Sequence, residues 1–301
     1  MKTVLIAAAA LTACAAAAPA SAAEVEIRNA VARVVVIVED RQDVAVEVTQ
    51  GRSRLPALQV RRQGRDVRID GGLRRTGMWG GDVRNCNAGR AGAAQPGEGA
   101  SVEVRNLGRV RLEDAPLIVL RTPRDVDVSA EGAVFGAVGR GAHDVRLENA
   151  GCGLWNIANI SGALLLKSLG TGALRAGISQ SATVALSGSS DISVGSNRRF
   201  TGAVSGSGSI QVSEVIGNVN AVIGGSGNIT IRSGTVDNLV AMIGGSGNIT
   251  VHATVLNADA AISGSGDVRI RCLSGARTQA VRGSGRLVIG NQENEEIGRC
   301  N

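Results

Sequence analysis

The sequence predicts an all-β protein built as a parallel β-helix, or β-solenoid, of about 19 residues per coil. The first observation is the tetrad Gly-Ser-Gly-Asn, which recurs with near copies down the C-terminal half. Successive copies are separated by 19, 20, 19 and 19 residues, counted between Gly208, Gly227, Gly247, Gly266 and Gly285. The second observation is the scarcity of rings, with no Tyr, two Phe and two Trp. A narrow coil interior has room for Val, Ile, Leu and Ala but not for a ring in every turn.

The residues around each corner align in columns. One apolar column follows the corner and consists of Ile192, Ile210, Ile229, Ile249, Val268 and Leu287. Two residues later comes a second, which consists of Val194, Val212, Ile231, Val251, Ile270 and Ile289. A third precedes the corner, with Leu186, Val204, Ile223, Ile243, Ile262 and Val281. We therefore expect one strand to enter and one to leave each corner, with all three columns facing inward and like residues stacked about 4.8 Å apart.

The repeat becomes irregular upstream of its sharpest copies. Gly153 and Gly172 continue the series, and Ser190 takes the place of the glycine in the next copy. With these copies the array has about eight coils, and we assign residues 131–290 to the solenoid. The pattern fades towards both ends, as expected for capping repeats. Recurring Gly-x-Gly also predicts corners that need a positive φ.

A polar column follows the corner directly and consists of Asp191, Ser209, Asn228, Asn248 and Asp267. Small polar side chains at a turn bond to their own backbone and to the neighbouring coil, and stacked amides form ladders. The structural interpretation is therefore a surface polar ladder. The functional alternative is a row of ligands for a cation or a glycan.

The chain begins with an export signal. Lys2 precedes an apolar run and a small-x-small ending, so residues 1–22 are predicted to be a signal peptide cleaved after Ala22. The run is too short to span a membrane, and the mature chain is predicted to have no transmembrane segment. A lipobox-like Leu-Thr-Ala precedes Cys14, so the alternative is a lipoprotein anchored at that cysteine. The protein is predicted to be exported, periplasmic or extracellular, or else anchored through Cys14.

Apolar and polar residues alternate over residues 23–130, which predicts an N-terminal region of β-strands with one solvent-exposed face. Residues 71–100 are Gly-rich and lose this period, so we expect a long surface loop carrying Trp79 and Cys86. Residues 291–301 form a polar C-terminal tail.

Four cysteines remain after the signal, and an even count in an exported protein predicts two disulfides. They are Cys86, Cys152, Cys272 and Cys300. Three pairings are possible; we favour Cys86 with Cys152, which would tether the loop, and Cys272 with Cys300, which would staple the tail. No CxxC or HxxxH spacing occurs, so no metal site is predicted.

Composition and motifs argue against nucleic acid and against cofactors. The net charge is +6, but the basic residues do not cluster, and rings on which bases could stack are scarce. The tetrads resemble the nonapeptide of calcium-binding β-rolls, but Ile229 and Ile249 occupy the position of the calcium-binding aspartate. No copy completes a P-loop. We expect no cofactor.

No catalytic constellation is apparent. His143 precedes Asp144 but lacks a positioned nucleophile, and His252 is expected to face solvent. A polysaccharide-acting β-helix enzyme would need converging acids, and those of the repeats fall on different coils: Asp191, Asp237, Asp259 and Asp267. This enzyme is nevertheless the alternative hypothesis, by analogy of fold.

The repeated Gly-Ser-Gly-Asn-Ile behind a signal peptide resembles the bacterial head GIN domain family, catalogued as heads of autotransporter adhesins and as a domain of unknown function. The resemblance rests on residues 206–210, 225–229, 245–249 and 264–268. It implies a right-handed parallel β-helix displayed in the envelope or outside the cell. The sequence thus predicts a non-enzymatic module for binding, adhesion or scaffolding, whose partner, an envelope glycan or a protein, is unknown.

Overall fold

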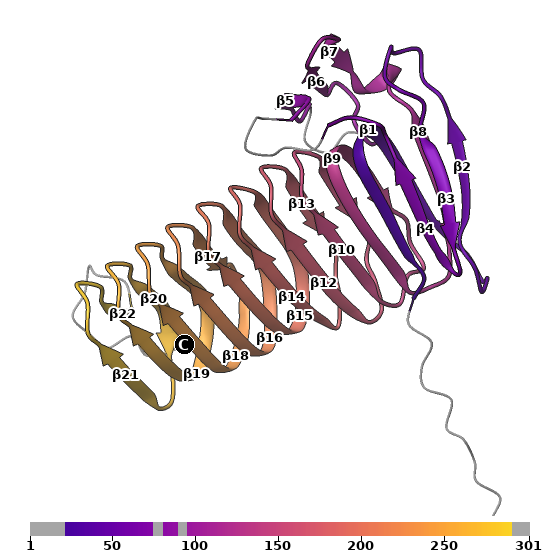
Figure 1. Ribbon diagram of the computed structural model, residues 1–301. Coiled ribbons are helices and arrows are strands. Elements are labelled where there is room, and N and C mark those ends of the chain that lie inside the picture. The colour runs from indigo at the N-terminus through magenta and orange to yellow at the C-terminus, as the bar shows by residue number, and fades with distance from the viewer. Residues whose placement is uncertain (1–21, 75–80, 90–94, 291–301) are drawn as a thin grey trace, which may run out of the picture.

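The computed structural model describes residues 22–74, 81–89 and 95–290. It is an all-β solenoid of about nine turns, each of about 19 residues, with an N-terminal β region (Figure 1). The predicted fold class is confirmed. Several predictions lie outside the described residues: the signal peptide up to residue 21 with Cys14, the position of Trp79, and the tail with Cys300.

Each coil gives one strand segment to a sheet before the glycine corner, here sheet A, and one to a sheet after it, here sheet B. Within each sheet, every strand pairs with the strands named before and after it. Sheet A contains β3 (Gln59–Gln63), β4 (Asp66–Asp70), β1 (Glu24–Val38), β9 (Val126–Val138), β10 (Val145–Asn149), β12 (Ala163–Ser168), β14 (Ser181–Leu186), β15 (Asp191–Val204), β16 (Ser209–Ile223), β18 (Gly234–Ile243), β19 (Ile249–Ile262) and β21 (Arg277–Val281). Sheet B contains β2 (Ala45–Thr49), β8 (Leu117–Thr122), β1, β9, β11 (Leu154–Ile157), β13 (Ala173–Ala176), β15, β16, β17 (Asn228–Ile231), β19, β20 (Val268–Leu273) and β22 (Leu287–Ile289).

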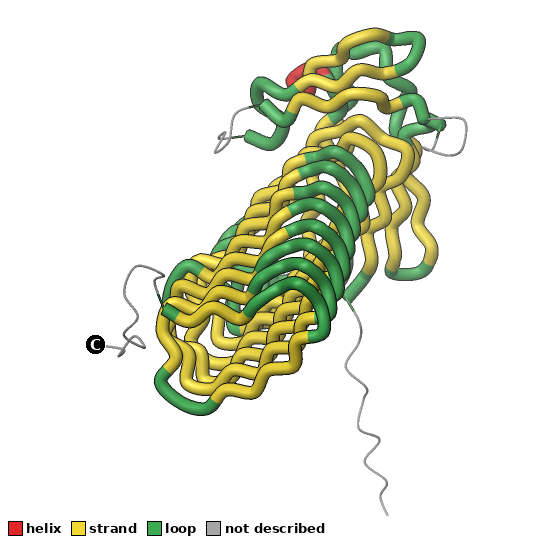
Figure 2. Tube along the Cα trace, turned by 90° about the vertical axis from the view of Figure 1, so that its left-hand side faces the viewer, coloured by secondary structure: helices red, strands yellow, loops and turns green. Residues whose placement is uncertain are grey.

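The core follows the predicted columns. Ile210 pairs with Ile229, which pairs with Ile249, and all three side chains are buried. The columns two residues later and before the corner keep the same register from coil to coil. Stacked β-branched side chains fill the interior of the coils, and burying them is the main source of stability. Figure 2 shows how the successive coils stack.

The corner glycines are required for a different reason than the sequence suggested. The sequence predicts a positive φ at the corners, yet neither Gly208 nor Gly227 has one; among the stacked corner glycines the exception is Gly132, in the first coils. A Cβ on Gly227 would instead collide with the carbonyl oxygen of Gly208 in the preceding coil. The corners need glycine because successive turns stack backbone on backbone.

This close stacking predicts a difference between two glycines of one corner. Gly227→Ala is expected to lower the free energy of unfolding by about 1–3 kcal/mol, because the new methyl group has no room. Gly224→Ala is the control, since a Cβ there meets nothing within 4 Å. Urea unfolding followed by circular dichroism measures both variants. Equal transition midpoints would contradict this account.

The parallel stack begins before the predicted solenoid boundary at residue 131. β1 pairs in parallel with β9 along nearly its whole length, so the first described strand is already a coil. On its other side β1 pairs in parallel with β4 and β8, which form the outermost turn. Two antiparallel strands, β2 on β8 and β3 on β4, then end the ladder. β2 and β3 are therefore the edge strands at this end, and both are short and carry charged side chains, Glu47 on β2 and Arg61 and Arg62 on β3, which hinder pairing with another chain.

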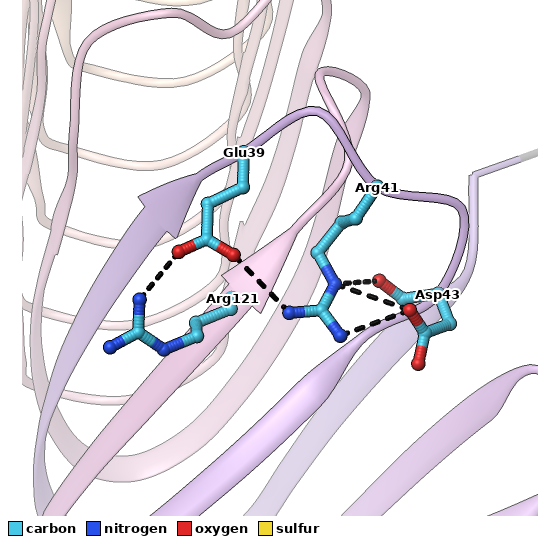
Figure 3. Close-up of polar contacts among 4 residues, drawn as sticks. All are labelled: Glu39, Arg41, Asp43 and Arg121. Carbon is cyan, nitrogen blue, oxygen red and sulfur yellow. Dashed lines mark hydrogen bonds and ion pairs between the residues drawn. The ribbon is translucent and has the colours of Figure 1, made fainter.

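The turn between β1 and β2 is held by an ion-pair network (Figure 3). Glu39 accepts hydrogen bonds from Arg121 of β8 at 2.5 Å and from Arg41 at 3.3 Å. Arg41 also bonds the carboxylate of Asp43 at 3.0 Å, and this contact lowers the pKa of Asp43. Charged side chains thus surround the turn next to the capping strand β2.

The described residues between β4 and β8, 71–74, 81–89 and 95–116, belong to an insertion at the corner of the outermost turn; we call them the flap. The loop predicted over residues 71–100 contains one strand, β5 (Val83–Asn87), which forms an antiparallel sheet with β6 (Ser101–Val104) and β7 (Gly108–Arg111) beyond the predicted loop. A short 3-10 turn, Leu112–Asp114, follows. Figure 1 shows the flap above the first coils. The five residues of β5 have too weak an apolar period to be recognised as a strand in the sequence.

Candidate functional site

The polar column lies at the start of the sheet B segments, as its spacing requires. Asn228 accepts hydrogen bonds at its Oδ1 from the backbone and side-chain amides of Asn248, at 3.0 and 3.3 Å. The amide of Asp267 donates to Asn248 Oδ1 at 3.0 Å, and that of Arg286 donates to Asp267 Oδ1 at 2.9 Å. Asp191 and Ser209 pair upstream in the same register. These oxygens serve the neighbouring coil, which is what a structural ladder requires.

The same column becomes apolar in the first coils. Ala173 pairs with Asp191, Leu154 with Ala173, and Phe135 lies one coil earlier, beside Trp155. Phe135 is fully buried although it points out of the solenoid, because the flap covers it. The flap and the outer side of these coils share a second hydrophobic core, which includes Val102 and Leu112. The change from polar to apolar residues along this column is the one feature of the sequence from which the covering of these coils by the flap could have been predicted.

A disulfide joins the flap to the solenoid. Cys86 of β5 is bonded to Cys152, which sits in a corner position, and their Cα atoms are 6.1 Å apart. The favoured pairing of these two cysteines is therefore present. Cys272 is buried in β20, while its predicted partner Cys300 lies outside the described residues, so that pairing stays a prediction.

A cleft of about 440 Å³ lies between the flap and the stacked corners. The flap side supplies Leu73, Arg74, Val83 and Arg84, and the solenoid side supplies Asn29, Glu131, Gly132, Ala150, Gly151, Cys152, Leu169, Gly170 and Thr171. Its size falls within the range of small-ligand sites, which often occur where two units of a fold meet. Of these lining residues, only Cys152 is a candidate site residue in the sequence, and there only for its disulfide.

The lining of the cleft combines charge, hydrogen-bonding groups and apolar surface. The backbone amide and guanidinium of Arg74 bond Asp82 at 2.8 and 3.1 Å, and these bonds lower the pKa of that carboxyl. Arg84 is exposed. The Oδ1 atom of Asn29 is buried and has no hydrogen-bond partner among the described residues. Leu169 adds an exposed apolar side chain on the corner beside the cleft.

The ionisable residues singled out from the sequence lie outside this cleft. His143 Nδ1 is 3.2 Å from Asp144 and 3.5 Å from Asp125, and each of the three side chains is about half exposed. Asp144 Oδ1 accepts the amide of Ala163, so it also serves as a ladder residue. His252 is exposed, as expected.

The four aspartates of the repeats do not form a catalytic pair. Asp191 and Asp267 share a column but are four coils apart, a distance of about 19 Å at the spacing between strands. Asp237 and Asp259 lie on neighbouring coils but at different positions along them. Glycoside hydrolysis by two carboxylates needs them within about 5–10 Å of each other.

Within the described parts of the chain, no helix is long and apolar enough to cross a membrane. A protein-family model described as "Putative auto-transporter adhesin, head GIN domain" matches residues 23–274. The chain belongs to this family. No curated protein and no solved structure matches it. The head GIN domain therefore includes both the flap and the coils that form the cleft.

Proposed function

We propose that this head GIN domain is an exported, non-enzymatic binding module of the cell envelope or cell surface, and that its ligand occupies the cleft under the flap. The observation that carries the proposal is the cleft itself. One of its walls is the flap, which a disulfide holds in place, and the other is formed by the stacked corners of the solenoid. Rigid walls reduce the entropy that binding costs. Membership of a family described as adhesin heads supports the same conclusion.

The ligand class that fits the lining best is a segment of an envelope glycan. Sugars present apolar ring faces and hydroxyl edges, and the cleft offers Leu73 and Val83 for the faces and Thr171 and Asn29 for the edges. The guanidinium of Arg84 favours an acidic sugar or a phosphate substituent. A protein segment is the other outcome of the test below.

The separation of the carboxylates supports the non-enzymatic part of the proposal. Glu131 is the one carboxylate among the described residues that line the cleft. A polysaccharide-acting enzyme, the alternative, would need a second acid or base close to it.

Export is part of the proposal and rests on the signal-like residues 1–22 together with the family description. We propose cleavage after Ala22, with anchoring through Cys14 as the alternative. The division into residues 23–130, the solenoid at 131–290 and the tail at 291–301 is likewise a proposal, and the parallel pairing of β1 with β9 crosses its first boundary.

The test compares two tryptophan substitutions at equivalent corner positions. Thr171 lines the cleft, and Ser226 has the same corner position in a coil beyond the flap. Binding to envelope glycans and to whole cells is expected to be lost in Thr171→Trp, which fills the cleft, and kept in Ser226→Trp. No binding by the wild-type protein, or equal binding by both variants, would overturn the proposal.

A further inference from the structure

Asn29, in the first coil that lines the cleft, has an unusual backbone conformation. Its φ is 51°, in the left-handed region, and among the described residues Asn106 is the one other non-glycine residue with a positive φ. Asn29 belongs to a β-bulge, because the register of β1 against β9 shifts between Ile27 and Ala30 and β1 has one residue more there. Bulges are common next to active sites, and left-handed residues other than glycine cluster at ligand sites.

The side-chain oxygen of Asn29 makes no hydrogen bond that would explain the choice of this residue. Its Oδ1 is buried and has no partner among the described residues, whereas its backbone carbonyl accepts the amide of Leu73 at 3.1 Å. The backbone alone would be served by glycine, which is what the next coil has at Gly132, with a φ of 108°. A buried acceptor without a partner destabilises the free protein, so an asparagine here points to a bond formed with a ligand.

The position of Asn29 in the cleft allows such a bond. Asn29 lines the cleft, and the χ2 torsion of asparagine is broad, so a small rotation turns Oδ1 towards a ligand. In the following coils the same wall contains Gly132, Gly151 and Gly170, from which no side chain rises. These four coils span about 14 Å at the spacing between strands, so the wall accommodates a short chain of sugars.

We infer that Asn29 determines the specificity of the cleft, and that its Oδ1 accepts a hydrogen bond from the acetamido N–H of an N-acetylated amino sugar. This inference rests on the proposed function and narrows the ligand to glycans that carry this group. An amide N–H brings one donor and no lone pair, so it satisfies a single unpaired acceptor completely. A hydroxyl at the same place would bring two lone pairs, which would need donors of their own.

The flap side of the cleft fits the rest of the acetamido group. Leu73, whose amide is bonded to the carbonyl of Asn29, and Val83 supply apolar surface for the methyl group. The guanidinium of Arg84 is a donor for the carbonyl oxygen. The cleft therefore offers an acceptor, an apolar contact and a donor, and an acetamido substituent uses all three.

Two trisaccharides that differ only at the second carbon of each ring test the inference. Tri-N-acetylchitotriose carries an acetamido group there, and cellotriose carries a hydroxyl. Isothermal titration calorimetry of the full mature chain is expected to give a dissociation constant about tenfold lower, or lower still, for the acetylated trimer, because a buried polar group discriminates against ligands that do not pair with it.

Asn29→Gly removes the acceptor but keeps a residue that adopts a positive φ, so the fold should be unchanged by circular dichroism. We expect this variant to lose the preference for the acetylated trimer. Asn106→Gly is the control and should keep it, because Asn106 has a φ of 64°, is exposed between β6 and β7, and is not among the described residues that line the cleft. Asn29→Asp retains an acceptor oxygen and should keep the preference as well.

The outcomes separate this inference from the proposed function. Equal affinity of the wild-type protein for the two trimers, or a preference that persists in Asn29→Gly, would overturn the inference. If the acetylated trimer does not bind but another envelope glycan does, and Thr171→Trp abolishes that binding, the inference fails and the proposed function stands. If no glycan binds, both fail.

Discussion

Replacing Trp155 with alanine is expected to lower the free energy of unfolding by about 3–5 kcal/mol. This side chain is fully buried inside the solenoid, where a Cβ on Gly136 in the preceding coil would collide with its ring. The ring thus fills a space that the glycine opens for it, and alanine would leave a cavity in the middle of the stack. Urea unfolding followed by circular dichroism measures the loss.

Trp155→Phe is the matched variant for this prediction. The indole Nε1 has no hydrogen-bond partner among the described residues, so phenylalanine removes volume without removing a bond. We expect it to lose clearly less stability than alanine does. Equal losses for the two variants would show that the size of the ring does not determine the packing at this position.

Removing the disulfide with Cys86→Ser and Cys152→Ser is expected to cost about 4 kcal/mol, the chain-entropy estimate for a closed loop of 66 residues. The larger consequence is local. The flap would then be held by the second hydrophobic core and by hydrogen bonds near its two ends, such as that from the amide of Leu73 to the carbonyl of Asn29, and the cleft would lose its fixed width. Thermal unfolding reports the first effect and amide hydrogen exchange the second.

The exchange experiment contains its own control. Amides of β5, β6 and β7 are expected to exchange faster in the double serine variant, while amides of β15 to β19 in the distant coils keep their wild-type rates. If the flap amides stay as protected as in the wild type, the disulfide does not hold the flap in place.

The coils could be predicted because their period is visible in the chain. Each residue of the Ile210 column recurs about 19 positions later, and a fixed period allows one register. The place of β1 could not be predicted in this way. Its partner in the next coil, β9, follows only after two capping strands, the outermost turn and the flap, so no local repeat connects them.

The candidate site was hidden for a similar reason. Phe135 and Leu154 interrupt the polar column, and in the sequence they resemble a degraded repeat. They are apolar because the flap, encoded between β4 and β8, covers them in space. The reason for the corner glycines could not be predicted from the sequence either, because the collision that a Cβ on Gly227 would cause is with the neighbouring coil.

Hydrogen exchange with and without a bound envelope glycan tests the central claim, that the ligand occupies the flap cleft, most directly. We expect the ligand to protect the backbone amides of Gly151 and Thr171 and those at the start of β5. The amides of Ser207 and Ser226, which have the corner position of Thr171 in coils beyond the flap, should be unchanged. Protection along Asn228, Asn248 and Asp267 instead would contradict this account and would make the polar column the binding site.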